Sequence, residues 1–262
     1  MAPEDTKQLE LVMLTYPSET AARLLKRLRL EGFSVRAVVL ERKNTIAGLY
    51  RVWRGIGTRR TVCLLRGRLN ACLGLTAEEP WRATSFYEDL ADEVVVVADL
   101  NGRASREAMS RLSPDVAVIG SAGILRPGVF DIPRFGTLNV HPGLLPRYRG
   151  CSTVCWALAE DGDTGVTVHI VDSGIDTGPI VAQRVVRVLP GETLPVFTRR
   201  LYAEGTELVT DALNSLAQGE PFTPAKQTSE GSRYYRMAPP AVRHRAEQKL
   251  AELAKTESGK DR

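Results

Sequence analysis

The sequence predicts an α/β fold in which helices flank a Rossmann-like, doubly wound and mostly parallel sheet of about seven strands. Three observations favour this fold. Short apolar runs of strand length alternate along the chain with segments of helical periodicity. Several runs consist almost entirely of apolar, often β-branched residues, which is typical of strands covered by helices on both faces. The chain has 262 residues, enough for one large domain with a substantial core.

The first strand–helix–strand unit lies at residues 9–40. Residues 9–15 (LELVMLT) form a short apolar strand. Ser18 can cap the following helix, and the glutamate after it suits the helix dipole. Apolar residues recur at helical spacing up to Gly32, and residues 34–40 (SVRAVVL) form the next strand. Two strands joined by one helix predict a parallel pair.

The remaining strands are short apolar runs separated by helices or turns. The run EVVVVA is nearly all valine, which predicts a strand buried on both faces. Helical spacing and the Pro and Gly residues that end helices predict helices at residues 105–112, 153–159 and 193–216. The predicted strands lie at residues 93–98, 115–120, 136–141, 166–171 and 180–188.

Two segments differ in composition from this alternating pattern. Residues 45–75 interleave Leu, Trp, Val and Cys with Arg and Gly, which predicts two short amphipathic helices that form an insertion or lid. Binding to a membrane surface is the alternative for this insertion. Beyond Pro221 the chain is polar and basic, with a short helix predicted at 242–254 and a disordered tail. We therefore expect a main domain at residues 9–218 and a short basic, partly disordered C-terminal extension at 219–262.

Composition excludes several classes of protein. Apolar residues make up 43% and charged residues 25% of the chain, which is ordinary for a globular domain. No run approaches the length of a transmembrane helix, and the polar first residues do not resemble a signal peptide, so we expect a cytoplasmic protein. The four cysteines lack zinc-site spacing and are interpreted as structural. The net charge is +4, with Arg and Lys concentrated at residues 41–70, which favours either an anionic partner or a solvated helix face.

The most informative polar residues follow a predicted strand, where doubly wound sheets bind their ligands. Asn139 and His141 are two positions apart on that strand and therefore point to the same side. An amide can polarise a carbonyl group and an imidazole can move protons near neutral pH, so the pair suits acyl chemistry. In isolation the pair could instead be structural. The glycines and prolines of the next loop, which bring backbone close to a ligand, favour a site.

Two further segments could complete such a site. The connector DSGIDTGP at residues 172–179 places two acids and two glycines between apolar strands. It could be a simple turn, or one of its acids could orient the imidazole of His141. The segment GSAGILRP at residues 120–127 combines small residues with Ile124 and Leu125. It could be an ordinary strand-to-helix turn, or it could accommodate a flat aromatic ligand.

Taken together, these segments resemble the folate-dependent formyltransferase family. The best-matched stretch is FGTLNVHPGLLPRYRG at residues 135–150, followed by GVTVHIVDSGIDTGPIVAQ at residues 165–183. The order Asn-x-His-Pro-x-Leu-Leu-Pro-x-x-x-Gly, with Gly-x-Asp-x-Gly further along, is specific. Strong resemblance covers residues 114–189, and weaker resemblance extends back to Leu9. It implies the formyltransferase version of the predicted fold.

The resemblance implies transfer of a formyl group from 10-formyltetrahydrofolate, as co-substrate, to an amine without a metal. It assigns catalytic positions to Asn139, His141 and Asp176. Asn139 and a protonated His141 would stabilise an oxyanion, and Asp176 would orient the imidazole. The pterin ring of the carrier would lie against Gly123, Ile124, Leu125, Val171, Asp172 and Ile175.

The expected acceptor is a small-molecule amine: an amino sugar, a nucleotide-linked sugar or an amino-acid-like metabolite. The segment YPSE at residues 16–19 lacks the glycine-rich phosphate loop of glycinamide ribonucleotide formyltransferases, which argues against purine synthesis. Basic residues of the insertion could bind an anionic acceptor such as a nucleotide diphosphate, or could simply solvate a packed lid. The expected acceptor contacts are Pro142, Gly143, Arg149, Gly150, Arg59 and Arg60.

Other functions stay open at this point. Methionyl-tRNA formyltransferases carry a β-barrel after the catalytic domain, and the residues after Pro221 are too few and too polar for one, which disfavours nucleic acid as a partner. Formyltetrahydrofolate hydrolases usually begin with a regulatory domain, which the residues before Leu9 are too few to form. A non-catalytic folate-binding protein would not need all three catalytic positions. The oligomeric state is open, with a homodimer among the options.

Overall fold

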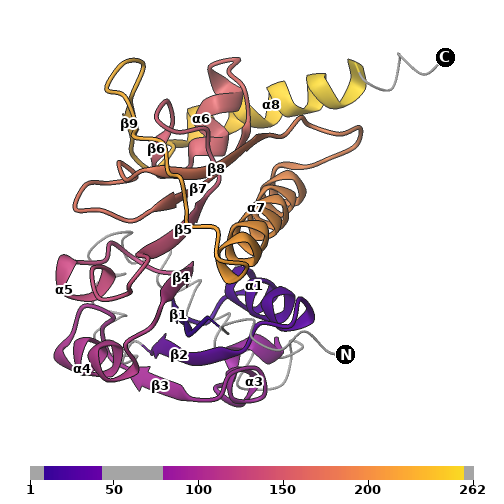
Figure 1. Ribbon diagram of the computed structural model, residues 1–262. Helices are drawn as coiled ribbons and strands as arrows, with labels where there is room; N and C mark the ends of the chain where they lie inside the picture. The colour runs from indigo at the N-terminus through magenta and orange to yellow at the C-terminus, as the bar shows by residue number, and fades with distance from the viewer. Residues whose placement is uncertain (1–8, 43–78, 257–262) are drawn as a thin grey trace, which may run out of the picture.

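The computed structural model describes residues 9–42 and 79–256 (Figure 1). The predicted insertion at 45–75, including Arg59 and Arg60, lies outside the described residues, as does the predicted tail after residue 256.

Seven strands form one sheet, as the sequence predicts. The four pairings among the first five strands of this sheet are parallel, and the two pairings at its other end are antiparallel. The sheet is therefore mostly parallel and Rossmann-like. The strand order is β3 (Val94–Val97), β2 (Val35–Glu41), β1 (Leu11–Thr15), β4 (Val116–Ser121), β5 (Thr137–His141), β7 (Gly165–Ile170) and β8 (Ile180–Val185).

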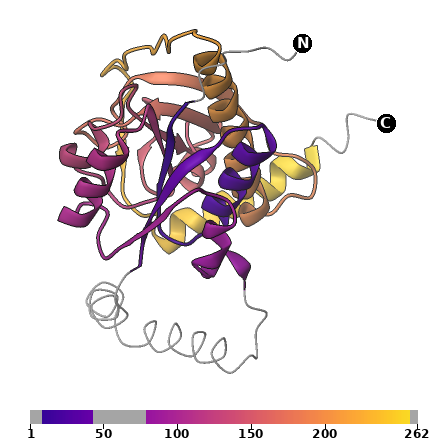
Figure 2. The same ribbon diagram turned by 60° about the horizontal axis from the view of Figure 1, so that its bottom comes forward.

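Helices cover both faces of the sheet (Figures 1 and 2). On one side, α1 (Glu19–Leu30) and α7 (Leu194–Ala217) pack on a core that includes Leu11 and Met13 of β1. On the other side, α4 (Arg103–Leu112) and α5 (Pro127–Phe130) pack on a core that includes the intervening residues of β1. Because successive side chains of a strand point to opposite faces, an unbroken apolar run is what a doubly covered strand requires.

Local signals fix the ends of the first helix. Ser18 is extended, and its side chain accepts a hydrogen bond from the backbone N–H of Ala21, as expected of an N-cap. The buried face of α1 comprises the residues predicted from helical spacing. The helix ends before Gly32, whose φ of 88° is a conformation that glycine adopts without strain.

The valine run at residues 93–98 does form β3, but the prediction that both of its faces are buried is wrong. β3 is the last strand at its edge of the described sheet, and it pairs only with β2 there. Val96 is 51% exposed, whereas Val97 is buried. Valine content predicts a strand but does not distinguish a central position from an edge position.

The remaining elements connect or cover this frame. The predicted C-terminal helix is present and longer than expected, and its residues Ala246 and Leu250 are buried in the main core. Before it, a short strand pairs with the segment that follows β5. These elements are η1 (Pro80–Arg82), α3 (Ser85–Glu88), β6 (Arg149–Gly150), α6 (Thr153–Ala159), β9 (Tyr234–Tyr235) and α8 (Pro240–Thr256).

Strand order places the switch point of the sheet at β1 and β4. From β1 the chain first builds outward through β2 and β3, then returns to add β4 and β5 on the other side. Ligands of doubly wound folds bind outside the carboxyl ends of the strands at such a point. Here those ends are Thr15, Ser121 and, on the next strand, His141. No helix in the described ranges is long and apolar enough to cross a membrane.

Candidate active site

Antiparallel pairing of β5 with β7 brings the first two polar side chains together. Asn139 lies directly opposite His169 in the register of the two strands, so both side chains are on the same face of the sheet. The amide Nδ2 of Asn139 lies 3.1 Å from Nε2 of His169. The Nδ1 of His169 lies 3.0 Å from the carbonyl oxygen of Ile170. A carbonyl oxygen can only accept, so Nδ1–H donates to it, and Nε2 accepts a hydrogen bond from the Asn139 amide.

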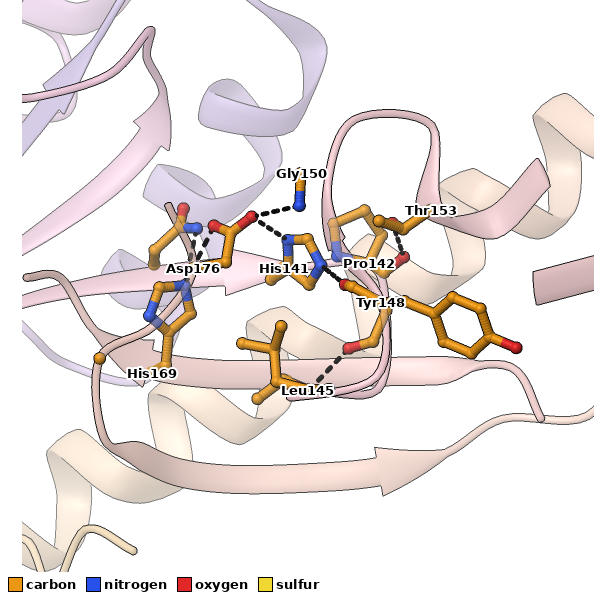
Figure 3. Close-up of polar contacts among 12 residues, drawn as sticks. His141, Pro142, Leu145, Tyr148, Gly150, Thr153, His169 and Asp176 are labelled. Carbon is orange, nitrogen blue, oxygen red and sulfur yellow. Dashed lines mark hydrogen bonds and ion pairs between the residues drawn. The ribbon is translucent and has the colours of Figure 1, made fainter. Parts of the chain in front are cut away.

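Asp176 occupies the loop between β7 and β8 and points between the two histidines (Figure 3). Its Oδ2 lies 3.5 Å from Nδ1 of His141, and its Oδ1 lies 3.6 Å from Nε2 of His169. The backbone N–H of Gly150 donates to Oδ2 at 2.8 Å. Asp176 has a φ of 51°, a left-handed conformation that aspartate tolerates better than most residues. The structure thus brings Asn139, His141 and Asp176 into one constellation.

The hydrogen bond of Nε2 sets the orientation of the His141 ring. Nε2 lies 2.6 Å from the carbonyl oxygen of Tyr148, which can only accept, so Nε2–H is the donor. Nδ1 therefore faces Asp176 and is the nitrogen available to take up a proton. Such a proton would lie between the imidazole and the carboxylate.

Burial and charge act in opposite directions on the two titratable groups. Burial lowers the pKa of His141, while the charge of Asp176 and the bond to Tyr148 oppose that shift. Burial alone would raise the pKa of Asp176, but the adjacent His169 imidazole, the charge of His141 and the Gly150 N–H outweigh it, and the pKa is lowered. At neutral pH the site therefore holds a neutral His141 beside an ionised Asp176. The expected protonated His141 would have to form during a reaction.

A large cleft adjoins this constellation, with a volume of about 1270 Å³. Asn139, His141 and Asp176 lie in its wall, and helices α1 and α7 form another side. This volume exceeds the usual 300–1,000 Å³ of a small-ligand pocket, so it could hold parts of two reactants. Within residues 9–42 and 79–256, no three His, Cys, Asp or Glu side chains gather closely enough to hold a metal ion.

The residues predicted to hold the pterin ring lie on the other face of the strand ends. Leu125 is buried in the α4 and α5 core, and Val171 packs against the same core. Ile124 is 72% exposed and Ile175 is 37% exposed, so both offer apolar surface. Asp172 accepts bonds from the Gly174 N–H and the Thr177 hydroxyl, which closes the loop. Folate binding at these residues stays a prediction.

The predicted acceptor residues occupy different environments. Pro142 and Gly150 line the cleft. Gly143 packs so closely on His141 and Thr153 that a Cβ atom would lie 2.9 Å from the imidazole Nε2. Arg149 belongs to β6, and its backbone N–H donates to the backbone carbonyl of Arg233.

The sequence interpretation did not identify His169, nor the Gly150 N–H and the Tyr148 carbonyl as partners of the site. His169 could have been found from the alternation of β7 only if the antiparallel register with β5 had been known. Main-chain donors and acceptors carry no side-chain signal at all. Tyr202 on α7 also lines the cleft, and its pKa is raised by burial.

The fold and the site define a class of protein: a Rossmann-like α/β protein with an amide, two imidazoles and a carboxylate beside a cleft suited to acyl transfer. Residues 78–213, just over half of the chain, match the formyl transferase family. The chain belongs to this family.

Sequence relatives agree with that assignment. Methionyl-tRNA formyltransferase of Aromatoleum aromaticum is 37% identical over 139 residues, 52% of this chain and 44% of the relative. The protein of the same name from Roseiflexus castenholzii is 40% identical over 136 residues, 51% of this chain and 43% of the relative. The chain spans about half the length of the curated relatives it matches.

Solved structures share the fold. A 4-N formyltransferase from Francisella tularensis aligns with a TM-score of 0.58 at 13% identity, over 93% of this chain and 88% of that one. The formyltransferase PseJ from Anoxybacillus kamchatkensis, in complex with a UDP-linked formamido sugar and tetrahydrofolate, aligns with a TM-score of 0.52 at 19% identity, over 93% and 99%. At these identities the likeness concerns the fold alone.

Proposed function

We propose that this protein transfers a formyl group from 10-formyltetrahydrofolate to a primary amine, with Asn139, His141 and Asp176 as catalytic residues. The observation that carries the proposal is Asp176, whose carboxylate contacts His141 and His169 while Asn139 contacts His169 at the same cleft wall. Family membership supports the same chemistry.

Each residue has a role that its geometry permits. A primary amide has two N–H donors, and one from Asn139 reaches His169, which leaves the second to donate to the oxygen of the formyl group as negative charge develops there. His141 Nδ1 accepts the proton that the attacking amine loses, and Asp176 stabilises the resulting imidazolium. His141 then returns a proton to the departing folate nitrogen as its bond to the formyl carbon breaks. The products are a formamide and tetrahydrofolate.

The carrier fits the exposed apolar surface beside the site. Ile124 and Ile175 are both exposed, and their neighbours Leu125 and Val171 share one apolar core. Apolar side chains at the rim of a polar site suit a flat aromatic ring such as the pterin. A folate bound there would bury these apolar side chains, and this burial would favour binding.

The acceptor is proposed to be an anionic molecule that carries the amine. Five cationic side chains and four acidic ones line the cleft, and one of the acids is Asp176 itself. Among the cations, Arg23 and Arg199 lie along the α1 and α7 walls. A nucleotide-linked amino sugar meets this description, as the sequence interpretation expects. The cationic side chains of the cleft are Arg23, Lys26, Arg27, Arg199 and Arg243.

Methionyl-tRNA is the second candidate, and the sequence comparisons favour it. The relatives described above are named methionyl-tRNA formyltransferases, and tRNA is also a polyanion. Those relatives are matched over about half their length.

A phosphate at the start of α1, as in glycinamide ribonucleotide formyltransferases, is not part of the proposal. Ser18 caps this helix end through the Ala21 N–H. Glu19 follows and forms an ion pair with Arg23 at 2.8 Å. A carboxylate in the first turn would repel a phosphate that approached the helix N-terminus.

One assay separates these candidates. The purified protein is given 10-formyltetrahydrofolate with methionyl-tRNA, with nucleotide-linked amino sugars, with amino-acid-like amines or with no acceptor, and tetrahydrofolate release is followed. Release that depends on one acceptor class identifies it, and the Asp176→Asn variant serves as the inactive control. Release without any acceptor indicates a hydrolase. No release in any mixture contradicts the proposed activity.

A further inference from the structure

The chain that leaves α7 runs past the start of β8 to β9 before it reaches α8 (Figure 1). We call residues 225–237 the C-terminal strap. Its first contact is at Ala225, which exchanges two backbone hydrogen bonds of 2.8 Å with Ile180 at the start of β8. Its last element is β9, which pairs with β6.

The pairing of β9 with β6 sets the direction of one donor in the site. The N–H groups of Arg149 and Cys151 donate to the carbonyls of Arg233 and Tyr235 at 3.0 and 2.9 Å. Successive N–H groups along a strand point to opposite sides, so the N–H of Gly150 points away from β9. It donates to the carboxylate of Asp176. The strap therefore aims the backbone donor that holds Asp176.

Gly150 is adapted to this contact. Its φ is 99°, and a Cβ atom there would collide with the carbonyl oxygen of Tyr235 and the ring of Tyr234. Only glycine allows the strap to approach the loop this closely.

The same pairing holds the partner of His141. Tyr148, which accepts the bond from His141 through its carbonyl, packs its ring 5.5 Å from that of Tyr235. The ring centroid of Trp156 lies 5.1 Å from that of Tyr235, and Glu160 accepts a 2.7 Å hydrogen bond from the Tyr235 hydroxyl. Burial and the bond to Glu160 raise the pKa of Tyr235 to about 12, so the hydroxyl stays a donor at neutral pH. Tyr235 thus anchors the strap beside β6.

Gln227 holds the opposite side of the catalytic loop. Its side-chain Nε2 donates to the carbonyls of Asp176 at 3.0 Å and of Gly178 at 2.6 Å. Carbonyl oxygens can only accept, so the amide nitrogen must be the atom that faces them. These bonds restrain the backbone on both sides of Thr177, where Asp176 has its left-handed conformation.

We propose that the C-terminal strap, through Gln227 and Tyr235, is a positioning element that holds the Asp176 carboxylate and the His141 imidazole in their reactive arrangement. The inference rests on the proposed function, because it assigns these residues a part in that reaction. Neither residue is expected to touch a substrate. Each acts through the loop that it restrains.

The sharpest variant is Gln227→Glu, which keeps the size of the side chain but presents a carboxylate to two carbonyl oxygens. We expect kcat to fall by about tenfold or more, since small misplacement of reactive groups is costly. The KM for 10-formyltetrahydrofolate should change less than kcat, because Gln227 does not contact Ile124 and Leu125, which belong to another segment of the predicted pterin surface. The pH dependence of kcat should also shift, because Asp176 would change its distance from His141, His169 and Tyr202, the titratable groups around it. Gln248→Glu, on the exposed face of α8, is the matched control and should behave as wild type.

Tyr235 gives a graded second test. Tyr235→Phe keeps the ring contacts with Tyr148 and Trp156 and should retain most of kcat. Tyr235→Ala removes them and should lower kcat as Gln227→Glu does. If Tyr235→Phe retains kcat while Tyr235→Ala loses it, the aromatic ring anchors the strap and the hydroxyl is not required.

A readout without substrate keeps this inference distinct from the proposed function. The ¹⁵N chemical shifts of the His141 ring report its titration in the free protein. Gln227→Glu and Tyr235→Ala should shift the midpoint of that titration, and Gln248→Glu should not. If the wild-type protein formylates no acceptor, the proposed function fails, but the His141 titration still tests the role of the strap. The inference is overturned if both strap variants are folded by circular dichroism and their His141 midpoints equal the wild-type midpoint. An unchanged kcat in both strap variants also overturns it.

Discussion

At the residue scale, two neighbouring groups make the site sensitive to acid in two separate pH ranges. His141 is buried and has a lowered pKa, so folding disfavours its protonated form. Asp176 has a lowered pKa because its partners favour its charged form despite burial. In both cases the unfolded chain binds a proton more readily than the folded one. Stability is therefore lost on acidification, first through His141 and then through Asp176.

These signs predict the pH dependence of unfolding. The contribution of His141 is complete above its ordinary pKa of about 6.5 and declines as the pH falls toward its lower value in the folded protein. The contribution of Asp176 is complete above about 3.9 and is lost as the pH falls through its lowered pKa. Urea unfolding across pH should show His141→Asn removing the upper decline and Asp176→Asn the lower one. If stability falls with pH in the same way for the wild type and both variants, the pKa shifts of His141 and Asp176 are contradicted.

Asn139 should matter to the reaction and little to the carrier. If its second amide N–H stabilises the oxyanion, Asn139→Ala should lower kcat by about 10²–10³-fold and leave the KM for 10-formyltetrahydrofolate near wild type. Asn214→Ala, near the end of α7, is the control for the same substitution. An Asn139→Ala enzyme with full kcat would remove this residue from the mechanism.

At the element scale, α7 holds the strand that carries the site. Gly205 of α7 faces β5 and β7, and a Cβ atom there would be 2.7 Å from Val166 and closer still to Val140. Val140 lies between Asn139 and His141, so helix packing at this point sets the position of both side chains. Glycine permits the close approach that the helix makes to the sheet.

This contact predicts an unusual effect of a helix-favouring substitution. Gly205→Ala should improve helix propensity by about 1 kcal/mol, but overpacking of a close contact costs about 1–3 kcal/mol. We expect a net loss of stability in urea unfolding. Asp211→Ala, on the exposed side of the same helix, reports the propensity effect without the contact. If Gly205→Ala equals or exceeds wild type in stability, α7 and the sheet can separate without cost.

The same elements indicate how far sequence patterns determine this fold. Apolar runs and helical spacing locate the seven strands of the main sheet and the longer helices, because burial on two faces leaves a strong signal at residues such as 9–15. The short elements η1, α3, α5, β6 and β9 were not predicted. The direction of a strand and its position at an edge leave no such signal. β3 is part-exposed at an edge of the sheet, and β7 runs antiparallel to β5. The spacing of Asn139 and His141 was enough to place them together. His169 depends on a cross-strand register, and the strap on main-chain contacts, which side-chain patterns do not encode.

At the scale of the whole molecule, the constellation separates two surfaces that could bind different reactants. The cleft between α1 and α7 is lined by charged side chains and by apolar residues such as Leu30. The other surface offers exposed Ile124, just before α5, and exposed Ile175, in the loop after β7. A transfer reaction requires both reactants to reach Asn139, His141 and Asp176 together, so the folate should occupy one of these surfaces and the acceptor the other.

Folate binding should stabilise the folded protein in proportion to ligand concentration, because the unfolded chain has no such site. With 5-formyltetrahydrofolate, a stable analogue, at about 100 times its Kd, the gain should be about 2.7 kcal/mol, seen as a rise in Tm. Ile124→Ser should reduce this rise. Leu30→Ser is the matched control, since Leu30 is 82% and Ile124 72% exposed, and it should leave the rise intact. If Leu30→Ser alone reduces the rise, the folate lies between α1 and α7 and the predicted pterin surface is wrong. A wild-type protein with no rise at all would contradict folate dependence.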